Sequence, residues 1–106
     1  MLRGEVWWID FNPSIGGEIQ KTRPAIIVSN NAFNRAMNRV QVVPVTSNIS
    51  KCFPCEAYVD IEGKTSKAMA DQLATVSKLR LKSKIGQISS KDMFELERAI
   101  KVQLEL

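Results

Sequence analysis

The sequence of 106 residues contains no histidine. This absence removes the side chain that most often serves as an acid or base near neutral pH, and also the commonest zinc ligand. It excludes nucleophile pairs of the Ser–His and Cys–His type as well. Any chemistry performed by this chain therefore depends on arginine, lysine, carboxylates, hydroxyls or backbone amides.

Cysteine is scarce, because its two copies both lie in one short motif, Cys52-Phe53-Pro54-Cys55. A single C-x-x-C without a second pair or a histidine cannot complete a four-ligand zinc site in one chain. A thioredoxin-like redox site needs the motif at the start of a helix, whereas here it lies between two strand-like segments. The motif is interpreted as structural or incidental, with redox chemistry or a metal shared between subunits as the alternative.

Long apolar runs are missing too, since none approaches the roughly 20 residues that a membrane helix needs. The residues up to Glu5 lack the apolar stretch of a secretion signal, so we expect a cytoplasmic protein. The length accommodates one hydrophobic core, which predicts a single domain over residues 1–106. Fifteen basic against eleven acidic residues give a net charge of +4, which modestly favours a polyanionic partner.

Strand-like segments alternate with turn signals along most of the chain. The pattern predicts strands at 3–11, 25–29, 40–46, 55–61 and 67–76, a polar loop at 12–22, and a short helix at 31–38. Residues 78–88 suit a turn of helix followed by a strand. Pro24 is expected at the first position of its strand, where no ladder hydrogen bond is lost, and Glu62-Gly63 is a turn signal.

Residues 90–105 form the clearest predicted helix. Met93, Leu96, Ile100 and Leu104 recur at spacings of one helical turn and form an apolar stripe. Ser89 precedes them as an expected N-cap. Several short strands closed by one amphipathic helix predict a mostly β fold, a small β-barrel with a packed C-terminal helix.

The candidates for chemistry lie where polar residues interrupt or end apolar strands. They are Arg23, Thr46, Ser47, Asp71 and Gln72. Rigid strand ends are good platforms for catalytic groups. The ordinary alternatives are a surface arginine, a turn hydroxyl and, for Asp71, a buried capping or ion-pair residue. No phosphate-loop, dinucleotide, metalloprotease or calcium-binding pattern is present.

Four motifs, in this order, resemble the MazF/PemK family of toxin endoribonucleases. They are RGEVWWIDFNPSIGGEIQKTRPAIIVS (3–29), VVPVTSN (42–48), AMADQLATV (68–76) and KIGQIS (84–89) before the terminal helix. The resemblance covers essentially the whole chain. It implies an SH3-like barrel with a C-terminal helix (the MazF/Kid/CcdB-type fold), a homodimer and a cognate antitoxin with an acidic tail. It further implies sequence-specific cleavage of single-stranded RNA without metal or cofactor, giving a 2′,3′-cyclic phosphate (or 3′-phosphate) and a 5′-hydroxyl.

The resemblance carries Arg23 and Thr46 over as the central catalytic pair, and Glu18 as a carboxylate that some members are proposed to use. A guanidinium can bind the charged oxygens of a reacting phosphate, which suits a site without histidine. Two positions depart from the family. Met69 stands where some members have arginine, and Ala74 replaces a basic residue.

Further residues are candidates for holding RNA, namely Asn12, Gln20, Lys21, Phe53, Lys78 and Arg80, with Lys82 and Lys84 as a possible extension of a basic track. Ser47, Glu18, Asp71 and Gln72 are possible catalytic or RNA-contact residues. Trp7 and Trp8 are expected in the core. Two other functions stay open: a CcdB-like toxin that binds DNA gyrase, and a module that binds RNA without cutting it.

Overall fold

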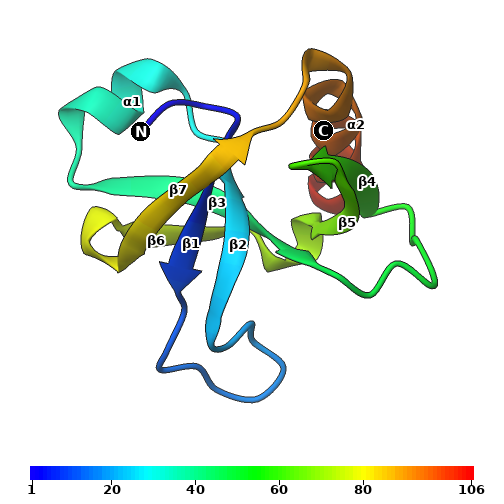
Figure 1. Ribbon diagram of the computed structural model, residues 1–106, viewed down its shortest axis with the longest axis horizontal. Helices are drawn as coiled ribbons and strands as arrows, with labels where there is room; N and C mark the ends of the chain where they lie inside the picture. The colour runs from blue at the N-terminus through cyan, green and yellow to red at the C-terminus, as the bar shows by residue number, and fades with distance from the viewer.

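The chain forms one curled antiparallel sheet with a long helix packed against its end (Figure 1). The computed structural model describes residues 1–106. Its strands are β1 (Glu5–Asp10), β2 (Thr22–Ile27), β3 (Arg39–Thr46), β4 (Glu56–Ile61), β5 (Lys64–Met69), β6 (Ala74–Ser77) and β7 (Leu81–Gln87). Its helices are α1 (Asn31–Ala36) and α2 (Ser90–Leu104), with two short 3-10 turns, η1 (Ala70–Gln72) and η2 (Lys78–Arg80).

Strand β3 is the hub of the sheet, because three other strands pair with it. Its first half pairs with β6, its middle with β2 and its last two residues with β5. The strand order is β4-β5-β3-β2-β1-β7, and no pairing joins β7 back to β4 or β6. The sheet is therefore a half-barrel, and the predicted mostly β fold with a C-terminal helix is confirmed.

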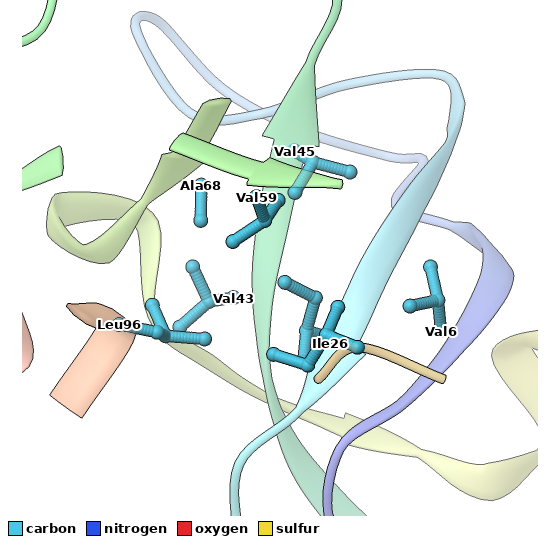
Figure 2. Packing of buried hydrophobic residues seen from close by; sticks show 8 residues of the cluster. Val6, Ile26, Val43, Val45, Val59, Ala68 and Leu96 are labelled. Atoms are coloured by element: carbon cyan, nitrogen blue, oxygen red, sulfur yellow. The ribbon is translucent and has the colours of Figure 1, made fainter. Parts of the chain in front are cut away.

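Apolar side chains leave the central strands on both faces of the curled sheet, as alternation along a strand requires. Ile26 of β2 packs with Val43 and Leu96 in one cluster (Figure 2). Its neighbours Ala25 and Ile27 belong to a second cluster. Burial on two sides explains why the central strands are apolar at almost every position.

The prediction of a single strand over residues 67–76 is wrong. The chain leaves β5 after Met69, makes the turn η1 and resumes as β6 at Ala74. β5 pairs with the end of β3, whereas β6 pairs with its beginning. The turn between them lets one stretch of chain reach both ends of the same strand, a long-range requirement that no local pattern signals.

Strand β2 begins earlier than predicted, so Arg23 lies inside the sheet and not in front of it. The pairing of β2 with β1 starts at Thr22 and places Pro24 opposite Trp8. Pro24 is therefore not the first residue of its strand. The other predicted strands and helices are present with slightly shifted ends, and the turn at Glu62 and Gly63 joins β4 to β5 as expected.

Helix α2 packs against β4, and its buried residues are Leu96 and Ala99. Ser89 caps it as predicted, since its hydroxyl accepts a hydrogen bond from the amide of Asp92 at 3.1 Å. Leu104, predicted for the apolar stripe, is 51% exposed, because the last turn extends past the part of the helix that packs on the sheet. Neither helix combines the length and apolar character needed to cross a membrane.

The two tryptophans of β1 do not both belong to the core. Trp7 is partly buried and donates through Nε1 to Oε1 of Glu5 at 3.0 Å. Trp8 is 41% exposed, so its predicted burial is wrong. The reason is that Trp8 lines an open pocket at the end of the sheet, beyond the covered part of its face.

Candidate active site

A pocket of about 480 Å³ opens where β2, the end of β3 and the β4–β5 hairpin come together. Arg23, Thr46 and Ser47 line it, so the structure brings these three predicted residues to one place. The other lining residues are Trp8, Pro24, Val45, Ile61, Glu62, Lys64, Ser66 and Ile85. We call this site the arginine pocket. It combines cationic and hydroxyl groups with an apolar lining.

Strand pairing explains why Arg23 and Thr46 meet. β2 and β3 are antiparallel, with Ala25 opposite Pro44. Continuing this register by two residues on each strand brings Arg23 opposite Thr46. Side chains two residues apart on a strand share a face, so Arg23 and Thr46 lie on the face of Ala25 and Pro44, toward its open end.

The guanidinium of Arg23 is only partly used by the protein. Its Nε donates to the carbonyl oxygen of Gln20 at 3.0 Å. Its two terminal nitrogens have no hydrogen-bond partner, and the side chain forms no ion pair. Because the residue is half-buried, the guanidinium is held in orientation while two of its donor groups stay available for a ligand.

Thr46 contributes a hydroxyl whose acceptor side is already engaged. Its Oγ1 accepts a hydrogen bond from the amide of Asn48 at 3.2 Å. This bond orients the oxygen and leaves the hydroxyl hydrogen free to be donated. Thr46 is half-buried at the last position of β3, where it pairs with Lys67 of β5.

A second pocket, of about 380 Å³, lies between the loop of residues 12–21 and the segment that runs from η1 to β6. We call it the loop pocket. Glu18, Asp71, Gln72 and Arg80 line it, and none of them lines the arginine pocket. The structure thus divides the predicted site residues between two pockets. Asp71 is exposed and forms no ion pair, so the alternative of a buried ion-pair residue is wrong.

Gln72 and Arg80 hold the 12–21 loop. Gln72 accepts from the amide of Ile19 at 3.2 Å and donates to the carbonyl oxygen of Gly17 at 3.3 Å. Arg80 donates to the carbonyl oxygen of Asp10 at 3.0 Å, just before the loop. Two side chains from the body of the protein therefore fix the loop that precedes Arg23.

The remaining residues considered for RNA contact are scattered. Asn12, Gln20 and Lys21 lie in the 12–21 loop, where the side chain of Asn12 accepts from the amide of Lys21 at 3.0 Å. Phe53 is 57% exposed and lines neither of these two pockets. Lys78 lines a separate cleft beside α1.

Sequence reasoning missed several side chains of the arginine pocket, among them Trp8, Glu62 and Lys64. It assigns Trp8 to the core and Glu62 to a turn, and it gives no signal for Lys64. Glu62 and Lys64 reach the pocket because the β4–β5 hairpin folds against the end of β3, a contact between distant segments, whereas Trp8 reaches it from β1. Of these residues, only Trp8 had a signal in the local sequence, because it is one of two adjacent large aromatic residues.

The two cysteines are free, and the environment of Cys55 disfavours a thiolate. Burial, together with the carboxylates of Asp71 and Glu56, raises the pKa of the Cys55 thiol above its ordinary value. Redox-active cysteines need a lowered pKa, so the redox interpretation of the motif has no support here. No group of three or more Cys, Asp or Glu residues is placed to hold a metal ion.

Lys84, considered for the basic track, is paired with a buried carboxylate. Its Nζ lies 3.1 Å from Oε2 of Glu5, while Oε1 of Glu5 accepts from the amide of Leu2 and from Trp7, both at 3.0 Å. Burial by itself raises the pKa of Glu5, but these hydrogen bonds and the lysine charge outweigh it. The net result is a lowered pKa.

Comparison with known proteins gives a consistent result. Residues 2–104 match the family described as PemK-like, MazF-like toxin of type II toxin–antitoxin system. Endoribonuclease MazF9 of Mycobacterium tuberculosis is 36% identical over 115 residues, which cover 100% of this chain and 98% of that protein. Endoribonuclease MazF of Staphylococcus saprophyticus is 34% identical over 112 residues, covering 100% and 92%.

Solved structures agree with the sequence relatives. A mycobacterial endoribonuclease in complex with its cognate antitoxin has a TM-score of 0.84 at 27% identity, covering 100% of this chain and 96% of that one. MazF of Deinococcus radiodurans has a TM-score of 0.88 at 23% identity, covering 100% and 97%. The second likeness concerns the fold alone.

Proposed function

Because this chain belongs to the PemK-like, MazF-like toxin family of type II toxin–antitoxin systems, we propose that it is a sequence-specific endoribonuclease acting on single-stranded RNA. The arginine pocket is the proposed site of cleavage. The observation that carries this placement is the guanidinium of Arg23, with two unpartnered terminal nitrogens on the same face as the Thr46 hydroxyl. The gyrase-binding alternative finds no support among the relatives named above.

In the proposed reaction, the 2′-hydroxyl oxygen of the RNA attacks the neighbouring phosphorus, and the bond to the next 5′-oxygen breaks. The products are a 2′,3′-cyclic phosphate, which hydrolysis converts to a 3′-phosphate, and a 5′-hydroxyl. Negative charge grows on the non-bridging oxygens during this step. The free nitrogens of Arg23 bind such oxygens in a bidentate manner, and the hydroxyl of Thr46 donates one further hydrogen bond.

Arg23 stabilises charge and does not carry protons in this mechanism, because the pKa of a guanidinium lies above about 12. Its bond to the carbonyl of Gln20 orients it before substrate binds. Such preorganised donors are effective because they need no rearrangement as charge develops. We propose that the reaction requires neither a metal ion nor a cofactor.

Single-stranded RNA is held by stacking on aromatic rings and by cationic side chains. Trp8 offers an exposed indole in the arginine pocket, and Lys64 adds a positive charge there. Asn12, Gln20 and Lys21, in the loop that precedes Arg23, are proposed to contact the RNA beyond the cleaved bond. Arg80 holds the loop through one terminal nitrogen, and its other nitrogens are proposed to contact a phosphate of the RNA.

Control by a partner is also part of the proposal. Like the relatives described as complexes with an antitoxin, this chain is proposed to bind a cognate antitoxin and to act as a homodimer in the cytoplasm. An acidic, disordered tail on that antitoxin is suited to compete with RNA for a cationic site. Such inhibition is expected to weaken as salt rises.

The test is cleavage of a long single-stranded RNA in EDTA, with mapping of the ends. Arg23→Ala is expected to lower the single-turnover rate by about 10²–10³-fold, the usual loss for one preorganised donor, and Thr46→Ala by less. Arg35→Ala is the matched control, because it removes the same charge from an exposed position on α1. Wild-type cleavage by a folded Arg23→Ala variant contradicts the assignment. Salt-sensitive RNA binding without cleavage favours a passive RNA-binding module.

A further inference from the structure

Glu62 is the one acidic residue that lines the arginine pocket, and the mechanism above has no group to take the proton of the 2′-hydroxyl. Glu18 and Asp71, the carboxylates expected from sequence, line the loop pocket. On the premise of the proposed endoribonuclease function, we propose that Glu62 is the general base of this enzyme. A carboxylate is a suitable base in a chain without histidine.

The backbone conformation at Glu62 is a first indication that the turn itself does not explain a glutamate at this position. Ile61 pairs with Lys64, so Glu62 and Gly63 form a two-residue hairpin turn in which both φ angles are positive, 52° and 77°. Turns of this kind favour Asn, Asp or Gly at the first position, because other side chains are strained there. Unfavourable conformations of this kind concentrate at functional sites.

Gly86 of β7 is a second sign, because it makes room for the carboxylate. A Cβ built on Gly86 would lie only 2.5 Å from Oε1 of Glu62. The φ of Gly86 is not positive, so its backbone conformation does not require glycine. The Glu62 carboxylate therefore lies against the backbone of β7, where a glycine permits close approach. From there the residue lines the arginine pocket on one side and the pocket beside the start of α2 on the other.

The carboxylate of Glu62 has no partner within the protein. Glu62 forms no ion pair, although Lys64 lines the same pocket, and no protein group donates a hydrogen bond to it. The residue is exposed, so its proton can be exchanged with water. Arg23 and Glu62 thus supply one pocket with a charged donor for the phosphate and an unpaired acceptor for the hydroxyl proton.

The 2′-hydroxyl proton moves to a carboxylate oxygen of Glu62 while the 2′-oxygen forms its bond to phosphorus. The bond between phosphorus and the 5′-oxygen breaks, and the 5′-oxygen takes a proton from water. Glu62 then releases its proton, which neutralises the hydroxide left by that water. No oxidant, reductant or further reactant is needed.

The central experiment compares wild type with Glu62→Gln in single-turnover cleavage across a range of pH. Loss of the base is expected to lower the rate by about 10²–10⁴-fold and to abolish the fall in rate on the acidic side of the profile. RNA affinity is expected to stay within about threefold. Asp60→Asn is the matched control, since it removes the same charge from the same hairpin, where Asp60 accepts from the Thr65 hydroxyl at 3.0 Å.

A double-mutant cycle tests whether the contact between Gly86 of β7 and the Glu62 carboxylate matters for cleavage. Gly86→Ala is expected to slow cleavage in the wild-type background by about tenfold or more, because its Cβ displaces the carboxylate. In the Glu62→Ala background the same substitution is expected to have no further effect, since no carboxylate remains to be displaced. Additive losses mean that Gly86 acts independently of Glu62, and they contradict the proposal that Gly86 positions the Glu62 carboxylate.

The outcomes separate this inference from the proposed function. If wild type leaves RNA intact, the endoribonuclease proposal fails. If wild type cleaves and a folded Glu62→Gln variant cleaves within about threefold of its rate, Glu62 is not the base while the function stands. A slower Glu62→Gln variant that keeps the acidic limb of the profile also overturns the assignment, because another group is then accepting the proton.

Discussion

Two loops adjoin the strand ends that carry Arg23 and Thr46 of the arginine pocket, and the protein holds these loops in different ways. The 12–21 loop leads into Arg23, and the 47–55 loop follows Thr46. Neutral hydrogen bonds from Gln72 fix the middle of the first loop, and Arg80 donates to the carbonyl oxygens of Asp10 and Asn12 at its start. The second loop is fixed by a buried ion pair and by further donors to its carbonyls. The comparison indicates that the loop after Thr46 is held more firmly than the loop before Arg23.

The 47–55 loop is fastened at several points by side chains of the body. Lys67 donates to the carbonyl oxygen of Lys51 at 2.8 Å and pairs with Glu56 at 3.3 Å, both side chains being about nine-tenths buried. Tyr58 donates to the carbonyl oxygen of Ile49 at 2.9 Å. Arg98 of α2 also reaches this region, donating to carbonyl oxygens at the end of the loop and the start of β4.

Breaking the buried ion pair gives the largest expected effect. Lys67→Met removes the charge that compensates Glu56 and the donor to Lys51, which leaves a carboxylate buried without its partner. Loss of one member of such a pair costs about 3–5 kcal/mol. Denaturant unfolding measures this loss. Hydrogen exchange should show a faster amide at Phe53, which is bonded to Glu56 at 2.9 Å, and an unchanged amide at Ile19.

The double variant Glu56→Gln with Lys67→Met is the control for that experiment. It removes both charges but keeps an amide oxygen able to accept from Phe53. Replacing both partners of a buried pair costs much less than removing one, so part of the lost stability is expected to return. If the single variant is as stable as wild type, the ion pair does not hold the 47–55 loop.

A third segment, the N-terminus, is held by the buried Glu5 through the amide of Leu2. Here the effect of the carboxylate's charge can be distinguished from the effect of its shape and packing. Glu5→Gln is expected to cost about 1.5–3 kcal/mol near neutral pH, the range for hydrogen bonds to a charged group. Because the pKa of Glu5 is lowered from 4.5 in the folded state, its ionised form stabilises the fold above that value. This contribution is lost as the pH falls below 4.5 and through the lowered pKa.

Unfolding of wild type and Glu5→Gln at a series of pH values measures this effect. The two free energies of unfolding should differ most near neutral pH and converge in acid. A difference that stays constant down to acidic pH would show that Glu5 acts through shape and packing and not through its charge.

The sequence predicted the places of Arg23 and Thr46 better than it predicted the residues that surround them in the pocket. Strand periodicity and the motifs placed both residues at strand ends, and the antiparallel register joined them. Glu62 and Lys64 were missed because only the pairing of β5 with β3 brings their hairpin to the pocket. Trp8 was misplaced for a related reason. Alternation along a strand predicts on which face of the sheet a side chain lies, but not whether other elements cover the sheet at that position.

The same limit explains Gln72. Its place in the AMADQLATV motif suggested a site residue on a strand, yet it lies in the turn η1, where its amide faces the 12–21 loop. A side chain that can both donate and accept is suited to hold a loop carbonyl and a loop amide at once. Sequence spacing gave the residue, while its partners Gly17 and Ile19 follow only from the fold.

The smallest expected effect comes from loosening the 12–21 loop. Gln72→Ala removes the bonds to Ile19 and Gly17, which are partly exposed, so we expect a loss of about 1 kcal/mol in unfolding free energy. Hydrogen exchange should speed up at Ile19 and leave Phe53 unchanged, the reverse of the Lys67→Met result. Gln72→Glu keeps the acceptor for Ile19 and is expected to preserve that protection.

Cleavage should slow only a few-fold in Gln72→Ala, because the loop reaches Arg23 through one bond, from Nε to the carbonyl of Gln20 at 3.0 Å. The terminal nitrogens that bind the phosphate remain in the pocket, so the change is expected mainly in KM. A loss as large as that of Arg23→Ala would mean that the position of the guanidinium depends entirely on the two hydrogen bonds of Gln72. The contrast between a weakly held and a firmly held loop would then be wrong, because both sides of the pocket would depend equally on the side chains that hold their loops.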